Sequence, residues 1–205
     1  SQHASLSAER FLRDEGFSHS ILVDLKRQEG AILLNGRPIP AKTLMPEGSL
    51  LTIHITDSAA SSSIDPVPMD LSIVYEDEDL MILNKPAGLP VHPSMGHRDD
   101  TLANGLSWYF KEKGEDFAFR AISRLDRDTT GLLIIAKNNA SACLLSRQVS
   151  HQLIEKEYLA AASGCIPESG TIDAPIRRAD DSVIERMVDL SCGDPARTHY
   201  ERLFY

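Results

Sequence analysis

The 205-residue chain is poor in cysteine, has no long apolar run and carries fewer basic than acidic residues. Its three cysteines, Cys143, Cys165 and Cys192, are widely separated and form no CxxC pair. An odd number of scattered cysteines argues against both a disulfide framework and a structural zinc site. We therefore expect reduced cysteines and no bound metal.

The longest apolar stretches hold about five residues, far fewer than the roughly 18 that a membrane-spanning helix needs. The first ten residues also lack the basic-then-apolar order of a signal peptide. These two absences predict a cytoplasmic protein that does not associate with membranes. A hydrophobic content of 42% is nevertheless enough to build a core in one large domain or two smaller ones.

Basic side chains are also few. The chain has 21 Lys and Arg but 30 Asp and Glu, which gives a formal net charge of −9. Proteins that hold nucleic acids through their phosphates usually present a basic surface. The composition therefore argues against a general polyanion binder. Any nucleic-acid site must be a local basic patch on an acidic body.

Residues 1–56 are predicted to form a small α/β module. Helical spacing of apolar residues falls in 8–15 and 20–28, Asn35-Gly36 is a strong hairpin-turn signal, and 51–55 alternate as in a half-buried strand. Basic and acidic side chains are balanced here, six of each. Four basic residues are candidate phosphate contacts, with solvated surface charge as the alternative for each: Lys26, Arg27, Arg37 and Lys42.

Residues 57–68 are small and polar and end in two prolines, which predicts a linker. A second domain is expected over 69–205. Its strands and helices do not alternate regularly, so the pattern favours an α+β fold with a mixed, largely antiparallel sheet. Strands are expected at 71–75, 80–83, 118–122, 132–136 and 155–162, and helices at 102–113 and 139–151.

Residues 123–137 are the most informative stretch, reading Ser-Arg-Leu-Asp-Arg-Asp-Thr-Thr-Gly followed by an apolar run. Asp126 is placed on a short loop ahead of a buried strand, where catalytic groups tend to lie. The alternative is an Asp that caps backbone amides in a turn. Arg124, two residues earlier, would point to the same side of an extended loop. Its guanidinium suits phosphate or base contacts, or else an ion pair with Asp126 or Asp128.

Two other strings stand out. Tyr158 lies in Glu-Lys-Glu-Tyr-Leu-Ala, where a tyrosine in a strand is usually a core residue. The string Asn-Lys-Pro-Ala-Gly-Leu-Pro-Val-His-Pro over 84–93 predicts an ordered loop after a strand and contains Lys85 and His92.

The Asp126 string resembles the signature of the RluA/RluD-type RNA pseudouridine synthases, His-Arg-Leu-Asp-x-x-Thr-Ser/Thr-Gly-Leu, in which the Asp is catalytic. The strings around Tyr158 and over 84–93 are similar to two further strings of that family. Within the first module, 16–20, 30–36 and 48–51 resemble an S4-like RNA-binding domain.

The resemblance implies that Asp126 is catalytic, that Arg124 enters the RNA and helps to expel the target uridine, and that Tyr158 stacks on its base. It implies a substrate RNA, ribosomal first and transfer RNA second, a monomer, and no metal or cofactor. His92 and Lys85 are RNA-binding candidates on the same basis. The remaining supporting residues are Leu125, Thr129, Thr130, Gly131 and Lys156.

Two departures qualify this expectation. Ser123 stands where the family usually has His. Family members also continue into a Gly-Arg-Thr-His-Gln-Ile-Arg-type motif, so the catalytic domain is expected to be partial here and these residues alone to have little or no activity.

The rival hypothesis is a non-catalytic RNA-binding protein on the same fold. A glycosidase is a weak third alternative, since it would need a second carboxylate about 5–10 Å from Asp126 and Asp128 could be only a guess.

Overall fold

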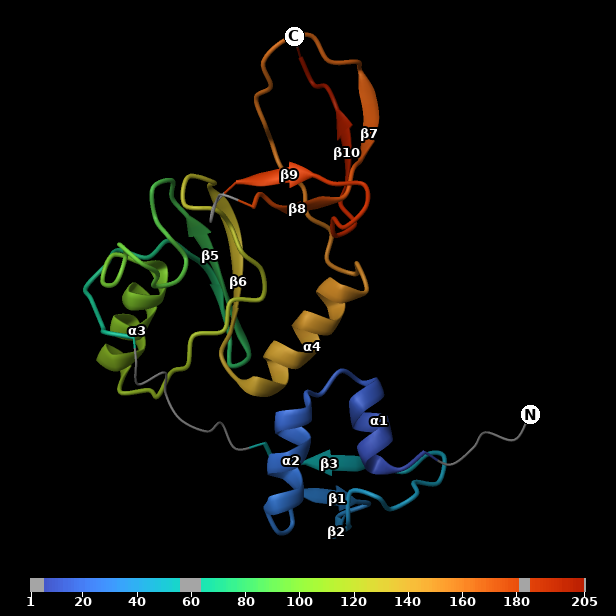
Figure 1. Cartoon of the computed structure of the whole chain (residues 1–205). Coiled ribbons are helices and arrows are strands. Elements are labelled where there is room, and N and C mark those ends of the chain that lie inside the picture. The colour runs from blue at the N-terminus through green and yellow to red at the C-terminus, as the bar shows by residue number, and fades with distance from the viewer. Residues whose placement is uncertain (1–5, 56–63, 181–184, 205) are drawn as a thin grey trace. The chain divides into compact units, whose positions relative to one another are not determined.

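The computed structural model describes residues 6–55, 64–180 and 185–204. The chain divides into two compact units, Ser1–Glu155 and Lys156–Tyr205 (Figure 1). Every strand pair within the described residues is antiparallel, and helices accompany the sheets of the first unit, so the predicted α+β class is confirmed. No helix in the described part of the chain is long and apolar enough to cross a membrane.

The N-terminal module of the first unit has two short helices and a three-stranded sheet. Ser7 and Ser18 cap the helices by accepting hydrogen bonds from backbone amides, as serine commonly does at N-caps. Asn35 and Gly36 make the predicted hairpin turn, with φ of +49° and +77°. The sheet order is β2-β1-β3. The elements are α1 (Ala8–Asp14), α2 (His19–Arg27), β1 (Ile32–Leu34), β2 (Arg37–Pro38) and β3 (Leu51–Ile53).

A second sheet, in the order β4-β5-β6, carries the candidate site. Helix α3 (Leu102–Lys113) packs on it, and the two share an apolar core that includes Met81, Leu83, Leu106 and Phe110. The helix begins at a capping box between Thr101 and Asn104 and ends at Gly114 in the left-handed conformation. The strands are β4 (Ile73–Glu76), β5 (Leu80–Lys85) and β6 (Gly131–Ala136). The strand expected at 118–122 is reduced to a single bridge between Ala121 and Ile135.

Part of the predicted linker is bound to α3. The side-chain amide of Asn104 donates to the carbonyl of Asp65 at 2.8 Å, and the Ser107 hydroxyl donates to that of Ile64 at 3.2 Å. Ile64 is itself buried. Residues 57–63 of the predicted linker lie outside the described residues.

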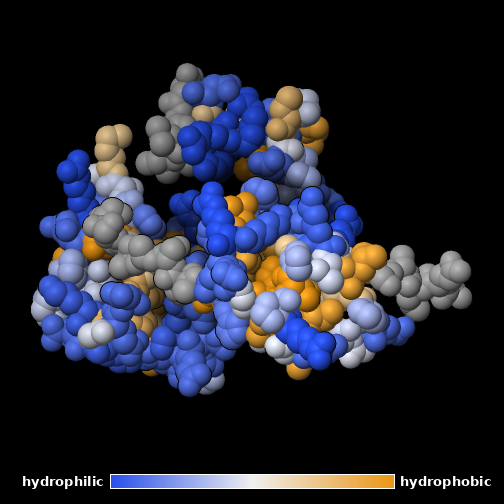
Figure 2. All heavy atoms as spheres, turned by 90° about the horizontal axis from the view of Figure 1, so that it is seen from below, coloured by the Kyte–Doolittle hydropathy of each residue, from blue (hydrophilic) through white to orange (hydrophobic). Residues whose placement is uncertain are grey.

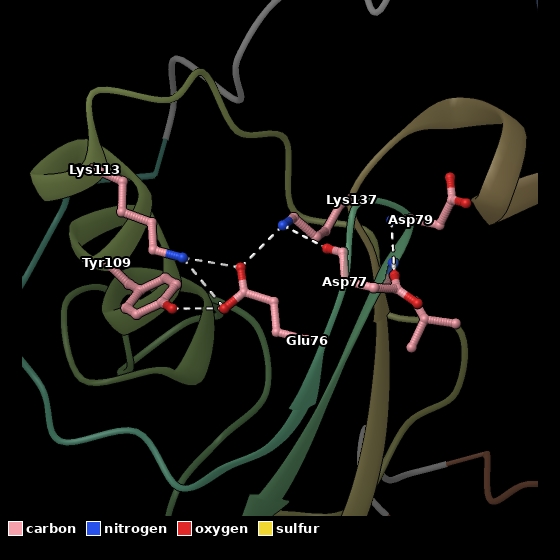
Figure 3. A network of polar contacts seen from close by, with 7 residues as sticks. Glu76, Asp77, Asp79, Tyr109, Lys113 and Lys137 are labelled. Atoms are coloured by element: carbon pink, nitrogen blue, oxygen red, sulfur yellow. Dashed lines mark hydrogen bonds and ion pairs between the residues drawn. The ribbon is translucent and has the colours of Figure 1, made fainter.

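A polar network ties the β4–β5 turn to α3 and to the end of β6 (Figure 3). Glu76 accepts hydrogen bonds from the Tyr109 hydroxyl at 2.6 Å, from Lys113 at 3.0 Å and from Lys137 at 2.9 Å. Lys137 also donates to the carbonyl of Asp77. Burial alone would raise the pKa of Glu76, but the hydrogen bonds from Tyr109, Lys137 and Lys113 outweigh it and hold the pKa at about 2.

This network predicts an acid-dependent loss of stability. Because folding lowers the pKa of Glu76 from 4.5 to about 2, its contribution is complete above pH 4.5 and disappears as the pH falls through 2. The side chain is only 18% exposed, so the contribution at neutral pH should be at most about 3 kcal/mol. Urea unfolding of Glu76→Gln should show a smaller pH dependence between pH 5 and pH 3 than the unmodified chain. The exposed neighbour Glu78 supplies the control, Glu78→Gln, and equal pH dependence in all three proteins would contradict the assignment.

Helix α4 (Asn139–Ser150) follows β6 and completes the first unit. Its N-cap is Asn138, and the side chains of Asn138 and Ser141 both donate to the carboxylate of Asp79, at 2.9 and 3.0 Å. The start of α4 is therefore fastened to the β4–β5 turn.

The second unit consists of two antiparallel strand pairs. No apolar side chain is buried in its described part. The strand predicted at 155–162 is wrong, because these residues are exposed and pair with no other strand; an alternating sequence makes a strand only where a ladder partner is available. The elements are β7 (Ser169–Asp173), β8 (Ile176–Arg178), β9 (Arg186–Val188) and β10 (Arg197–Glu201), paired β10-β7 and β8-β9.

The surface agrees with the charged composition. Figure 2 shows a face that is mostly hydrophilic, on which hydrophobic residues gather in separate groups. Scattered exposed apolar residues are ordinary on protein surfaces and do not by themselves mark a site.

Candidate active site on the Asp126 loop

The Asp126 loop, residues 123–130, is held at both ends by β6. Before the loop, the Ile122 amide donates to the carbonyl of Ile134 at 2.9 Å, and after it the chain enters β6 directly. Within the loop the Thr129 amide donates to the Asp126 carbonyl at 3.1 Å. Asp126 therefore opens a hydrogen-bonded turn at the end of the sheet where β5 ends and β6 begins.

Lys85, the last residue of β5, holds this turn to the sheet by hydrogen bonds. Its side chain is buried, and its Nζ donates to the carbonyls of Pro86, Leu89 and Arg127 at 2.9, 2.9 and 2.7 Å. All three ammonium protons thus have an acceptor. The prediction that Lys85 contacts RNA is not supported by this geometry, because a buried ammonium that is fully hydrogen-bonded cannot reach a phosphate. Its role here is to join the 86–89 turn to the Asp126 turn.

The charge of Lys85 also acts on the loop. Burial lowers the pKa of Lys85, while the nearby charges of Asp128 and Asp126 work in the opposite direction. Asp128 additionally pairs with Arg127 at 3.1 Å, which lowers the pKa of Asp128.

The side chains around Asp126 alternate in exposure. Leu125 is half-buried and packs against the core under α3, whereas Arg124 and Asp126 on either side of it are exposed. Within the described residues, neither Arg124 nor Asp126 has a side-chain hydrogen bond or ion pair. The alternatives of an Asp126 that caps the turn and an Arg124 in a local ion pair therefore find no support. Both groups are available to a ligand.

Two further supporting residues, Thr129 and Thr130, close the loop, and Gly131 opens β6. The Thr129 side chain is partly buried and that of Thr130 is exposed. Gly131 pairs with Lys85 across the sheet and has φ of +121°, a conformation that residues with side chains rarely adopt. A β-carbon there would meet nothing within 4 Å. The requirement for glycine therefore comes from the backbone and not from lack of space.

We expect Gly131→Ala to lower the free energy of unfolding by about 1–3 kcal/mol, the usual cost of a backbone conformation of this kind. Urea denaturation followed by circular dichroism measures the change. Thr130→Ala, at the exposed neighbouring position, should change it by less than about 0.5 kcal/mol. An unaltered midpoint for Gly131→Ala would contradict the assignment of strain.

His92 is exposed on the loop that follows β5. Its ring meets that of Phe119 edge-on at 5.5 Å between centroids, and its Nδ1 lies 3.2 Å from the Pro93 carbonyl oxygen. Phe119 lies on the segment that leads into the Asp126 loop. This places His92 on the loop end of the sheet, and its RNA-binding role stays a prediction.

Among the four basic candidates of the N-terminal module, Lys26 pairs with the carboxylate of Glu9. Lys26 donates to Glu9 at 2.6 Å, and Arg13 donates to the same oxygen at 3.1 Å. The hydrogen bond from Lys26 is the main cause of the lowered pKa of Glu9, and the charges of Arg13 and Lys42 contribute. Arg27 and Arg37 are exposed elsewhere on the module.

Lys156 and Tyr158 lie in the second unit, whereas Asp126 lies in the first. Both are exposed, with Tyr158 at 60%, and neither belongs to a strand. The expectation that Tyr158 meets the same substrate as Asp126 therefore stays a prediction. Across the described ranges, no group of three or more His, Cys, Asp or Glu side chains is arranged to hold a metal ion.

Comparisons with known proteins identify related sequences. Residues 79–204 match the sequence profile of the family described as RNA pseudouridylate synthase. The chain is 32% identical over 196 residues to the uncharacterized RNA pseudouridine synthase YjbO of Bacillus subtilis, which covers 95% of this chain and 69% of that protein. It is 35% identical over 176 residues to the ribosomal large subunit pseudouridine synthase D of Neisseria meningitidis serogroup B. This match covers 86% of this chain and 47% of that protein.

A solved structure, human RNA pseudouridylate synthase domain containing 1, has a TM-score of 0.49 and 28% identity, covering 63% of this chain and 50% of that one. Apart from YjbO, the chain spans between about two fifths and three fifths of the length of the curated relatives that it matches.

Proposed function

Because the chain belongs to the RNA pseudouridylate synthase family, we propose that it converts uridine in RNA to pseudouridine, with Asp126 as the catalytic carboxylate. The observation that carries this proposal is the placement of Asp126. It is an exposed, unpaired carboxylate on a turn that Lys85 fastens to the sheet, inside the segment that matches the family. A rigid scaffold that presents one reactive side chain is the usual design of a catalytic loop.

The reaction is an isomerisation. The N1–C1′ bond of the uridine breaks, the detached uracil turns, and C5 forms a new bond to C1′ while its proton moves to solvent and N1 takes one up. Atoms and electrons balance without a redox partner, so the reaction requires no cofactor. Asp126 either attacks C1′ as a nucleophile or removes a proton from the sugar, and both steps need an ionised carboxylate.

The target uridine must leave its stack to reach the site, since its reacting atoms are shielded in folded RNA. We assign Arg124, next but one to Asp126, to the space that the flipped base vacates, and the exposure of its guanidinium supports this role. We assign Tyr158 to stacking on the base and Lys156 to its support. A phenol provides both a π face and a polar tip for this purpose.

We assign RNA binding also to the N-terminal module, as an S4-like domain, through Lys26, Arg27, Arg37 and Lys42. One relative is named ribosomal large subunit pseudouridine synthase D, and we propose ribosomal RNA as the substrate here, with transfer RNA second. The enzyme then acts in the cytoplasm as a monomer. The balanced charge of the module, on an otherwise acidic protein, supports phosphate contacts there.

Pseudouridine mapping of total RNA tests this proposal. RNA is compared between cells with and without the full-length gene, and after the gene is restored. A uridine that loses its modification on deletion and regains it on restoration would establish the activity and identify the RNA. No altered position in any RNA class would instead favour the non-catalytic RNA-binding protein.

A further inference from the structure

Helix α4 presents one stripe of residues to the N-terminal module. Asn139, Cys143 and Arg147 are spaced four residues apart and so lie on one face of the helix. Asn139 lines a small cavity together with Ile21, Asp24 and Leu25 of α2. Cys143 packs against the apolar core of the module. Arg147 completes the stripe by pairing with Glu15, just after α1, at 2.6 Å.

Gly16 makes the contact with Arg147 close. An added β-carbon at Gly16 would lie 2.9 Å from Cδ and 3.0 Å from Cβ of Arg147, so the arginine stem rests against bare backbone. Gly16 also has φ of +95°, in the region that favours glycine. One residue therefore allows both the turn after α1 and the approach of α4.

Helix α4 is also attached to the β4-β5-β6 sheet, which carries the Asp126 loop. Helix α4 follows β6, which begins directly after the Asp126 loop, and Asp79 fastens its first turn. No residue of α4 belongs to the apolar core under α3, and Ser141 is its one buried residue. Helix α4 also lies along β6, but the apolar core that its Cys143 packs against is that of the module.

We propose that the Asn139–Cys143–Arg147 stripe is the docking surface of the N-terminal module, and that Arg147 is a positioning residue for the RNA. Docking fixes the module's basic residues relative to the Asp126 loop, so that an RNA backbone bound by the module delivers its uridine to the loop at a set distance. The docking itself is independent of the enzyme activity, whereas its effect on RNA rests on the proposed function.

Amide ¹⁵N relaxation of the 205-residue chain tests the docking. In the unmodified chain, α2 and α3 should report the same rotational correlation time. Arg147→Glu should shorten the value for α2 by about twofold relative to α3, because tumbling time follows the size of the rigid body. The double variant Glu15→Arg with Arg147→Glu reverses the pair and should restore a common value.

Arg10→Glu is the matched control, since it reverses an equally charged residue whose 3.0 Å pair with Asp14 stays within the module. It should leave the correlation times equal. Different values for α2 and α3 in the unmodified chain, or no response to Arg147→Glu, would overturn the docking. A response to Arg10→Glu of the same size would overturn the specific role of Arg147.

Kinetics of the full-length protein test the effect on RNA. Arg147→Glu should raise KM about tenfold for a transcript of a large-subunit rRNA domain and leave kcat unchanged, because undocking lowers the effective concentration of the site. A short stem-loop with the same uridine should react as before, and the double variant should recover. An equal loss on both RNAs would refute positioning. If the unmodified enzyme turns over neither RNA, the proposed function fails while the relaxation experiment still decides the docking.

Discussion

Asp126→Asn in the full-length protein should reduce pseudouridine formation by about 10³-fold or more and leave RNA affinity unchanged. The amide has nearly the same shape as the carboxylate but can act neither as nucleophile nor as base, and loss of such a group commonly costs this much. Asp126 has no side-chain partner among the described residues, so its replacement should not disturb the turn. Single-turnover conversion and filter binding on the same RNA separate the two effects.

Asp128→Asn is the matched control because it makes the same chemical change two residues away. It removes an exposed pair with Arg127 and should alter the rate only a few-fold. Comparable losses at both positions would indicate that the charge of the loop matters and not one carboxylate. Full activity of Asp126→Asn would remove Asp126 from the mechanism.

Lys85→Met should produce the largest structural change. Methionine keeps the length and apolar stem of lysine but cannot bond the carbonyls of Pro86, Leu89 and Arg127. Leaving three partly buried acceptors without donors is costly, and we expect the free energy of unfolding to fall by about 3 kcal/mol. Activity should fall too, because the Asp126 turn loses its attachment to β5.

Urea denaturation, together with the salt dependence of RNA binding, distinguishes this role from a phosphate contact. A structural Lys85 gives lower stability and an unchanged slope of log affinity against log salt, whereas a phosphate contact would reduce the slope by about one and spare stability. Lys111→Met, on the exposed side of α3, serves as the control and should change stability by less than about 0.5 kcal/mol.

Features that depend on neighbouring residues could be predicted from the sequence. The helix expected at 102–113 coincides with α3, because the capping residue Thr101, the apolar spacing and the terminal Gly114 all act within a few residues. The exposure of Arg124 and Asp126 around Leu125 follows from simple alternation in the same way. The Asp126 loop could therefore be identified from the sequence alone, without knowledge of the fold.

Features that depend on residues far away in the sequence could not be predicted from it. The predicted strand at 155–162 has the right residues but no strand beside it. Lys85 bonds a carbonyl 42 positions away, and Arg147 pairs with a residue 132 positions away. One signal for Lys85 was present: it continues the alternation of Met81 and Leu83, both buried, so its place on β5 points it inward.

The triple attachment of Lys85 has a consequence for protein engineering. Because one ammonium binds both the 86–89 turn and the Asp126 turn, the two segments cannot be exchanged separately between homologous enzymes. A single residue inserted between Pro86 and Leu89 would misalign the Asp126 turn without altering any residue in it. Chimeras designed to change the RNA target should therefore transfer 85–93 and 123–131 as a matched set.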